Sequence, residues 1–307
     1  MRVLLTGGHG MVGRNIRAHP LAAELEIVAP ARSELDLRSK PAVLHGLRRW
    51  APDLVVHAAG KVGGIQANVS DPYAFLLENL EIGTNVIAAA SEVGVPRLIN
   101  LGSSCIYPRD VAGLLTEDMI LGGELEPSNE GYALAKLAAL KLCQYASAAK
   151  AGLCYKTILP CNLFGRWDNF DLRSAHLVPA IIHKVHRAKS EGLRTVEIWS
   201  DGHARREFMY AGDLADAVLQ IALRFDTAPT LMNVGLGHDH TVLEYYRAVA
   251  DVIGWQGEFT FDLTKPGGMR RKVVDVSRQT QWGWRPSTSL ADGIAATYEY
   301  FLQERCP

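Results

Sequence analysis

Short apolar runs alternate with longer segments of helical period along the first half of the chain. Each apolar run ends in small or polar residues, as buried parallel strands do. Strands that alternate with helices at this spacing are typical of an α/β protein with a doubly wound, Rossmann-like parallel sheet. The predicted strands are Val3–Leu5, Glu26–Ala29, Leu54–Gly60, Leu98–Leu101 and Tyr155–Leu159, and the main predicted helices are Pro72–Val93 and Asn129–Ala149.

The pattern changes after Gly165, where a polar and aromatic stretch follows the last of these strands. We interpret residues 1–165 as one Rossmann domain and residues 166–307 mainly as a smaller C-terminal lobe, with segments such as Met232–Val234 returning to the sheet. The lobe is expected to contain helices at 176–189 and 213–224, a strand at 196–199, a loop at 205–208 and a basic run at 265–272.

A glycine-rich turn follows the first predicted strand. The glycines at 7, 10 and 13 are three residues apart, and the next helix is expected to begin at Met11-Val12. Such a turn lets the backbone approach a pyrophosphate, and the helix N-terminus offers N–H groups and a positive dipole end. We therefore expect Gly7, Gly10, Met11 and Val12 to bind a dinucleotide, although the motif alone also fits a plain turn.

The residues after the second predicted strand indicate which dinucleotide is bound. This position meets the adenosine ribose, where an acidic residue favours NAD. The chain has Arg32 instead, which suits the 2′-phosphate of NADP, although a solvated loop charge is the simpler alternative. Asp36 and Leu37 are expected to flank the adenine. Ala58 is one of the small residues that would let the cofactor lie against the backbone of the third strand.

Composition narrows the classes of partner. The 307 residues contain 32 Lys and Arg against 33 Asp and Glu, so there is no basic excess for nucleic acid or an anionic membrane. No apolar run approaches the roughly 20 residues that a membrane span needs. The five cysteines lack CxxC spacing, which favours neither a disulfide framework nor a zinc site. We therefore expect a cytoplasmic protein with reduced thiols and no metal.

A tyrosine and a lysine four residues apart point to redox chemistry. Tyr132 and Lys136 would share one helix face. A neighbouring ammonium is expected to lower the pKa of the phenol from its usual value of about 10, and Lys136 can also bind the nicotinamide ribose. Ser103, at the end of a strand, can donate to a carbonyl oxygen. Such Tyr–Lys pairs are common on helix surfaces, but together with the serine and the glycine turn this one indicates hydride transfer to a carbonyl.

These motifs resemble those of the extended short-chain dehydrogenase/reductase superfamily, many of whose members act on nucleotide sugars. The similarity is greater to one branch, the GDP-L-fucose synthases, which are GDP-4-keto-6-deoxymannose epimerase/reductases. The matching segments extend nearly from end to end: Gly10–Gly13, Lys61–Ile65, Leu101–Pro108, Asn129–Lys136, Asp168–Phe170, Ser174–Ala180, Arg206–Phe208 and Arg271–Val276.

The resemblance implies an NADP(H)-dependent homodimer that epimerises a GDP-4-keto-6-deoxy-hexose at C3 and C5 and reduces C4. Ser103, Tyr132 and Lys136 would form the reductase triad. Cys105 and His176 would be the epimerase acid and base; without the resemblance, a free cysteine is more often a small buried hydrophobe.

The resemblance also implies that Asn162, Arg206 and Lys272 help to hold the GDP-sugar. We add Lys184, Trp199 and Arg271 as candidate substrate-binding residues. Arginines at 205–206 and 270–271 form two clusters in the second lobe, which suits a diphosphate, although a solvated basic face is the alternative.

Departures from the family pattern leave the exact sugar open. The family often has arginine where this chain has His9, proline where it has Gly131, and arginine where it has Lys184; Trp167 lies in the loop near the sugar. A GDP-L-colitose synthase-type C5-epimerase/C4-reductase, or a simple GDP-4-keto-sugar 4-reductase, would use the same parts.

Two other functions fit the chain less well. A 4,6-dehydratase or 4-epimerase with resident NAD is disfavoured by Arg32, and a dehydratase also by Ser104-Cys105 in place of an acid pair. A non-catalytic dinucleotide sensor is disfavoured because Tyr132 and Lys136 are both present.

Overall fold

The computed structural model describes residues 1–265 and 271–305. Six parallel strands form a central sheet in the order β10-β5-β4-β3-β1-β2. The fold is therefore the predicted α/β class, with a doubly wound parallel sheet. The strands are β1 Arg2–Thr6, β2 Glu26–Val28, β3 Leu54–His57, β4 Arg97–Leu101, β5 Cys154–Pro160 and β10 Leu231–Val234.

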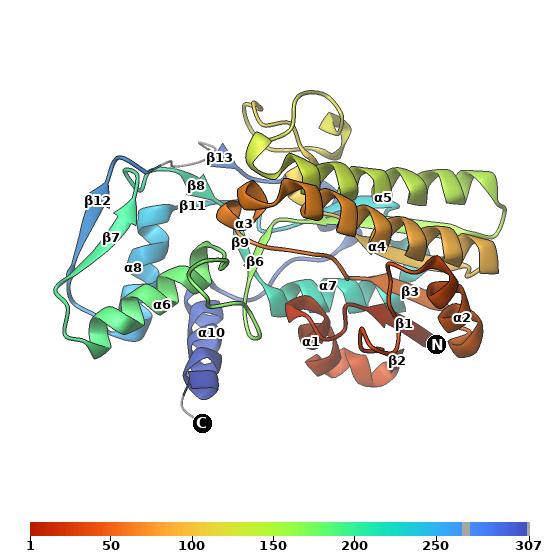
Figure 1. Cartoon of the computed structure of the whole chain (residues 1–307), viewed down its shortest axis with the longest axis horizontal. Helices are drawn as coiled ribbons and strands as arrows, with labels where there is room; N and C mark the ends of the chain where they lie inside the picture. Colours follow the sequence, from red (N-terminus) through yellow and green to blue (C-terminus); the bar gives the residue numbers. More distant parts are fainter. Residues whose placement is uncertain (266–270, 306–307) are drawn as a thin grey trace.

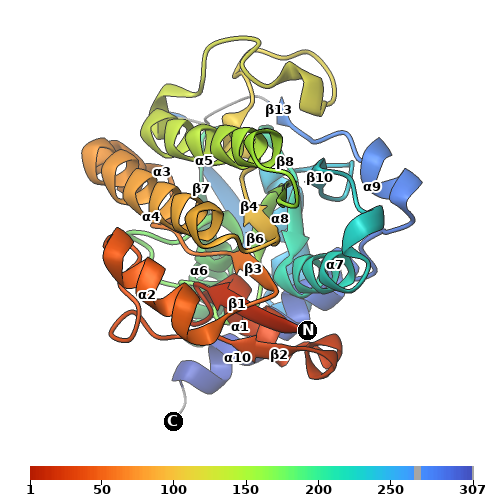
Figure 2. The same ribbon diagram turned by 90° about the vertical axis from the view of Figure 1, so that its right-hand side faces the viewer.

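Helices cover both faces of this sheet (Figure 2). Leu4, Val55 and Leu98 lie in one apolar cluster with α2 Lys40–Trp50, α4 Pro72–Val93 and α5 Glu130–Ala149. Their strand neighbours Val3 and Val56 lie in another cluster with α1 Met11–Ala18 and α7 Ala211–Leu223. Successive side chains of a strand point to opposite faces. A sheet buried on both faces thus explains why its strands read as continuous apolar runs.

The second half of the chain builds a separate apolar cluster at the left of Figure 1. Its strands, β7 Thr195–Trp199 and β12 Glu258–Asp262, pair in parallel. The helices packed in this cluster are α6 Leu177–Ser190, α8 Val242–Ile253 and α10 Leu290–Arg305. Nevertheless β10, also from the second half, lies beside β5 in the central sheet.

Two further small sheets join these parts. β6 Asn162–Phe164 pairs with β9 Phe208–Tyr210. β8 Arg205–Arg206 lies between β11 His240–Thr241 and β13 Arg271–Lys272. The prediction of a loop at 205–208 is therefore wrong. Glu207, between β8 and β9, is buried, and its carboxylate accepts three backbone N–H groups. The backbone on either side of it is paired, β8 with β11 and β13 and β9 with β6.

Other boundaries differ less from the predictions. The helix predicted at Pro72–Val93 is α4 itself, because Asp71 caps its start and Gly94, with a φ of 83°, ends it. The third strand ends at His57 rather than Gly60. The loop expected at 61–65 leads into a short helix, α3 Ile65–Ser70, and α9 Ser277–Trp282 follows β13. Within the described ranges, no helix is long and apolar enough to cross a membrane.

Candidate active site

The glycine turn between β1 and α1 is shaped by close backbone contacts. Gly7 has a φ of 74°, and a Cβ there would lie 2.7 Å from the Ala59 nitrogen. A Cβ on Gly13 would lie 2.2 Å from the Gly7 oxygen. Gly10 is the N-cap of α1 and no side chain caps this end, so the N–H groups of the first turn remain for an anion. The turn also lies against Ala58, and the cradle fits a dinucleotide pyrophosphate.

The predicted adenosine side of this site lies beyond β2. Arg32 is exposed in the turn that follows the strand. The Asp36 carboxylate binds Arg38, at 3.0 Å from Oδ2 to Nη2, and hydrogen bonds from Arg38 hold the pKa of Asp36 below its usual range. The carbonyl oxygen of Leu37 accepts from Asn85 at 3.0 Å. These bonds hold the residues that follow the turn of Arg32, and the turn itself is closed by the Glu34 N–H, which donates to the Ala31 oxygen at 2.9 Å.

The three predicted reductase residues meet at the carboxyl end of β4. Ser103 follows the strand, Tyr132 and Lys136 share one face of α5, and Ser103 is hydrogen-bonded to the Tyr132 phenol. The Lys136 Nζ donates to the Leu101 oxygen at 2.9 Å and lies 5.7 Å from the centre of the Tyr132 ring. A substrate carbonyl placed beside this cluster would meet the hydroxyl groups of Ser103 and Tyr132.

Burial dominates the protonation of this cluster. It lowers the pKa of Lys136 to about 8. It also raises the pKa of Tyr132, and this effect is larger than that of any neighbour. The expectation that Lys136 lowers the pKa of the phenol is therefore wrong here, because removing the phenolate from water outweighs the attraction of the ammonium. Tyr132 is held as a protonated phenol, which suits an acid.

Two donors converge on the thiol of Cys105. The Asn129 Nδ2 lies 3.2 Å from Sγ, and the Lys272 Nζ lies 3.5 Å from it. The backbone N–H of Cys105 donates to the Ser103 Oγ at 3.2 Å, which ties the thiol to the reductase cluster. The sequence prediction gave Asn129 no role, although it lies in a matching segment. Its Oδ1 is buried and has no hydrogen-bond partner.

His176 begins α6 as its N-cap, and its side chain makes no capping hydrogen bond. Burial lowers the pKa of its imidazole, so the ring is neutral at neutral pH. The segment before it is bound to the first half of the chain, since the Gly64 N–H donates to the Ser174 oxygen at 3.1 Å. His176 is therefore a neutral imidazole at the junction of the two halves.

The predicted substrate residues are held in different ways. The Asn162 Nδ2 donates to the Glu207 oxygen at 3.0 Å. The Lys184 Nζ lies 5.3 Å from the centre of the Trp199 ring, and Trp199 is 41% exposed. Burial lowers the pKa of Arg206, whose Nη1 donates to the Arg205 oxygen at 2.8 Å.

One carboxylate joins the two arginine clusters. Asp239 is buried and binds the Arg205 Nε at 2.7 Å and the Arg271 Nε at 2.6 Å. Arg271 therefore already has an internal anionic partner, whereas the neighbouring Lys272 reaches Cys105. Of the predicted basic run at 265–272, residues 266–270 lie outside the described residues, as does Cys306.

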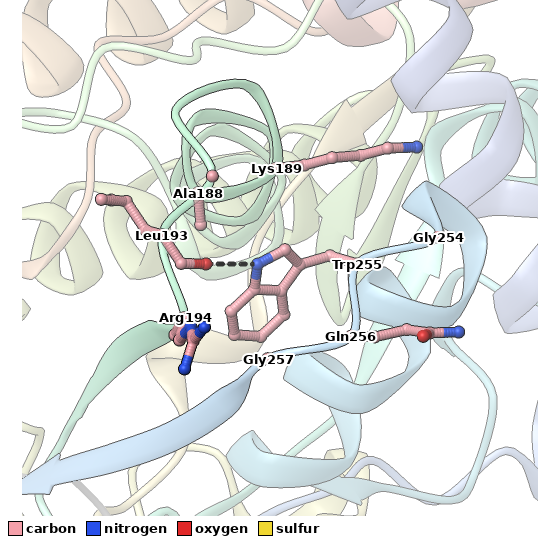
Figure 3. A pocket seen from close by; sticks show the side chains of 9 residues that line it. Ala188, Lys189, Leu193, Arg194, Gly254, Trp255, Gln256 and Gly257 are labelled. Carbon is pink, nitrogen blue, oxygen red and sulfur yellow. Dashed lines mark hydrogen bonds between the residues drawn. The ribbon is translucent and has the colours of Figure 1, made fainter.

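A separate pocket of about 300 Å³ lies where α6 and α8 end (Figure 3). Figure 3 shows Trp255 spanning it, with its Nε1 donating to the Leu193 oxygen at 3.0 Å. None of the predicted site residues lines it. In the described ranges, no cluster of three or more His, Cys, Asp or Glu side chains is arranged to hold a metal ion.

The glycine cradle after β1 and the Ser–Tyr–Lys cluster after β4 define a dinucleotide-dependent oxidoreductase of the extended short-chain dehydrogenase/reductase class. A model of the NAD dependent epimerase/dehydratase family matches residues 3–235. The chain belongs to this family.

Relatives within the family share nearly the full length of the chain. A GDP-L-fucose synthase of Azorhizobium caulinodans is 50% identical over 301 residues, covering 98% of this chain and 96% of the relative. A GDP-L-colitose synthase of Yersinia pseudotuberculosis is 48% identical over 305 residues, covering 99% of each. Among solved structures, a GDP-mannoheptose C4 reductase from Campylobacter jejuni with NADP bound has a TM-score of 0.87 at 28% identity, covering 98% of each chain.

Proposed function

We propose that the protein is an NADPH-dependent epimerase/reductase that converts a GDP-4-keto-6-deoxy-hexose by epimerisation at C3 and C5 and reduction at C4, as GDP-L-fucose synthases do. The observation that carries this proposal is the placement of Cys105 beside the Ser–Tyr–Lys cluster, with its sulfur facing two donors. A plain reductase needs no such thiol. The two curated relatives, named for fucose and colitose, support the GDP-sugar substrate.

Gly7, Gly10, Met11 and Val12 would hold the pyrophosphate of NADP(H), and the residues that end β3 would lie beneath it. When bound, NADPH supplies the hydride for C4. Arg32 would pair with the 2′-phosphate. Replacing Arg32 by Ala should therefore raise KM for NADPH and leave KM for NADH nearly unchanged. Equal losses with both cofactors would assign Arg32 a structural role.

Reduction uses the cluster on β4 and α5. Ser103 and Tyr132 donate hydrogen bonds to the C4 oxygen and draw electron density from the carbonyl carbon. As C4 receives hydride, its oxygen gains negative charge and takes the phenolic proton of Tyr132. The Lys136 ammonium stabilises the phenolate that remains.

Epimerisation uses the same donors for a different purpose. The C4 ketone acidifies the C–H bonds at C3 and C5. When a base removes such a proton, the electron pair moves to the C4 oxygen, where Ser103 and Tyr132 stabilise the enolate. Inversion requires a proton on the opposite ring face, so two residues are needed. We assign these exchanges to Cys105 and His176.

Solvent deuterium separates the two activities. With oxidised NADP bound, so that reduction is blocked, wild-type enzyme should incorporate deuterium at C3 and C5 of the keto-sugar. Cys105→Ser should nearly abolish incorporation while hydride transfer from NADPH persists. Exchange at C5 alone would indicate a colitose-type C5-epimerase. Reduction without exchange at either carbon would indicate a simple 4-reductase.

Substrate binding is assigned to Asn162, Lys184, Trp199, Arg206 and Lys272. Arg271 is retained as a candidate, with the condition that the sugar nucleotide must share it with Asp239. We also propose a division near residue 165, because a distinct apolar cluster gathers α6, α8 and α10.

We further propose that the enzyme is a cytoplasmic homodimer. Large apolar side chains are exposed on the neighbouring helices α4 and α5, including Tyr73 at 74% and Tyr145 at 65%. A second copy would cover this surface. The four described cysteines are unpaired, in keeping with a reducing compartment. A monomeric mass by sedimentation would contradict the dimer.

A further inference from the structure

A glycine-rich loop between β3 and α3 joins the two groups of proposed catalytic residues. Its first residues lie beside the reductase cluster, since a Cβ built on Gly60 would lie 3.6 Å from the Lys136 Nζ. The Lys61 N–H donates to the Asn79 Oδ1 at 2.9 Å, and the Asn79 Nδ2 donates back to the Lys61 oxygen at 3.1 Å. This end of the loop is therefore fixed to α4.

The other end of the loop is held by its own helix. The buried Asn68 of α3 donates through Nδ2 to the Gly63 oxygen at 2.9 Å and to the Gly64 oxygen at 3.1 Å. Gly64 in turn donates its N–H to the Ser174 oxygen at 3.1 Å. Ser174 stands two residues before His176. A short chain of backbone bonds thus leads from the Lys136 side to the His176 segment.

The His176 segment is also ordered from within. The Asn169 Nδ2 donates to the Ser174 Oγ at 2.7 Å, and the N–H groups of Ser174 and Ala175 both donate to the Asp171 oxygen, at 2.9 and 2.7 Å. This turn leads directly into α6, where the Ala180 N–H donates to the His176 oxygen. A shift of the turn would therefore move the histidine backbone.

Where the loop at Gly64 contacts the turn at Ala175, there is no space for a side chain. A Cβ on Gly64 would lie 2.7 Å from the Ala175 oxygen, a backbone atom that cannot move without its peptide. The backbone of Gly64 itself, at φ −65° and ψ 178°, is one that any residue adopts. Glycine is needed at 64 for close approach and not for conformational freedom.

We propose that Gly64 is a positioning residue for epimerisation: the 60–65 loop sets where His176 stands relative to the reductase cluster, and it needs direct backbone contact at Gly64 to do so. This inference rests on the proposed function, because it takes His176 as one of the two proton-exchanging groups. It predicts that the two activities respond differently to a change at Gly64, since hydride transfer does not use His176.

Gly64→Ala tests the proposal, with Gly63→Ala as the matched control. The nearest atoms to a Cβ on Gly63 would be side-chain carbons of Ala67 and Phe75, at 2.9 and 3.1 Å, whereas the nearest atom to a Cβ on Gly64 is the Ala175 oxygen. Both variants would be assayed for deuterium incorporation at C3 and C5 with oxidised NADP, and for hydride transfer from NADPH. Gly64→Ala should slow incorporation by about 10²-fold, as a misplaced catalytic group does, with kcat for hydride transfer retained. Gly63→Ala should keep the wild-type ratio of the two rates.

The outcomes separate this inference from the proposed function. If the wild-type enzyme incorporates no deuterium at C3 or C5, the proposed function is wrong. Wild-type incorporation with an unchanged ratio in Gly64→Ala, or equal losses of both activities, overturns the role of Gly64. If Gly64→Ala fails to fold by thermal melting, Asn68→Ala removes the donor to Gly63 and Gly64 without adding an atom. It should lower the same ratio, and an unchanged ratio overturns the proposal.

Discussion

Tyr132 shows how the surroundings of a single residue decide its chemical role. A tyrosine–lysine pair four residues apart predicts a phenol of lowered pKa, but burial raises the pKa of this phenol. A protonated phenol next to an ammonium is suited to giving a proton to the C4 oxygen. The protonation state of Tyr132, and with it the role of an acid, thus follows from burial, which the spacing of the two residues does not contain.

The first prediction concerns this proton. Tyr132→Phe keeps the ring and its packing on α5 but removes the donor, so kcat for NADPH oxidation should fall by roughly 10²–10⁴-fold. This rate would be measured as the loss of NADPH absorbance after stopped-flow mixing with the keto-sugar. The wild-type rate in this variant would exclude Tyr132 from the mechanism.

A second prediction at this scale is a pH dependence. Burial lowers the pKa of Lys136 to about 8, so the ammonium loses its proton as pH rises through that value. The neutral amine no longer stabilises the phenolate that forms at Tyr132. The rate of hydride transfer should therefore be highest below pH 8 and fall above it. A rate that rises through this range would contradict the role of Lys136.

At the scale of elements, two glycines of the turn from β1 to α1 have different roles: Gly13 is needed for packing, and Gly10 for cofactor binding. Gly13 meets the Gly7 backbone so closely that Gly13→Ala should lower the free energy of unfolding by about 1–3 kcal/mol, the usual cost of overpacking. In Gly10→Ala the new Cβ would lie 3.5 Å from its nearest neighbour, the Gly7 oxygen, which is an ordinary van der Waals distance, so the stability of this variant should stay near that of the wild type. Urea titrations would compare the two.

Gly10→Ala should also affect cofactor binding. Gly10 precedes the uncapped N-terminus of α1, where a methyl group would stand between the backbone and the pyrophosphate. Gly10→Ala should therefore weaken NADPH binding, measured by fluorescence titration, although it folds normally. If Gly10→Ala bound NADPH as the wild type does, the pyrophosphate would not lie at this turn.

At the scale of the whole molecule, Glu207 links distant parts of the chain. Its carboxylate accepts from the N–H groups of Leu236, Gly237 and Val274, at 2.6, 3.0 and 2.8 Å. It therefore joins the β8–β9 connection to the segment after β10 and to the segment that follows Lys272. Burial raises the pKa of this carboxyl to about 7.

Removing this carboxylate should destabilise the protein more than any surface change. Glu207→Ala leaves the buried Val274 N–H and the partly buried N–H groups of Leu236 and Gly237 without their acceptor, at about 1–3 kcal/mol each. The free energy of unfolding in urea should fall by at least about 3 kcal/mol, and Glu207→Gln, which keeps one oxygen, should lose less. The exposed Glu191 serves as the control, because Glu191→Ala should change stability by no more than about 0.5 kcal/mol. Equal effects at the two positions would contradict the role of Glu207.

The sequence by itself determined the features that depend on neighbours along the chain. Apolar runs gave the parallel strands, and Asp71 with Gly94 gave the ends of α4. The glycine spacing at 7, 10 and 13 indicated the phosphate cradle, since close approach of backbone to ligand depends on which residues lack a Cβ. The motif at 132–136 indicated the reductase chemistry for the same local reason.

Only the tertiary structure decided which distant groups meet. Arg205–Arg206 and Phe208 are strand and not loop because their backbone pairs with β11, β13 and β6, which come from other parts of the chain. Lys272 lies at the Cys105 sulfur, across 167 residues of chain, while Arg271 is paired with Asp239. Contacts between residues so far apart leave no periodicity in the sequence. Burial, which sets the protonation of Tyr132 and Lys136, likewise arises only when the packed chain excludes water.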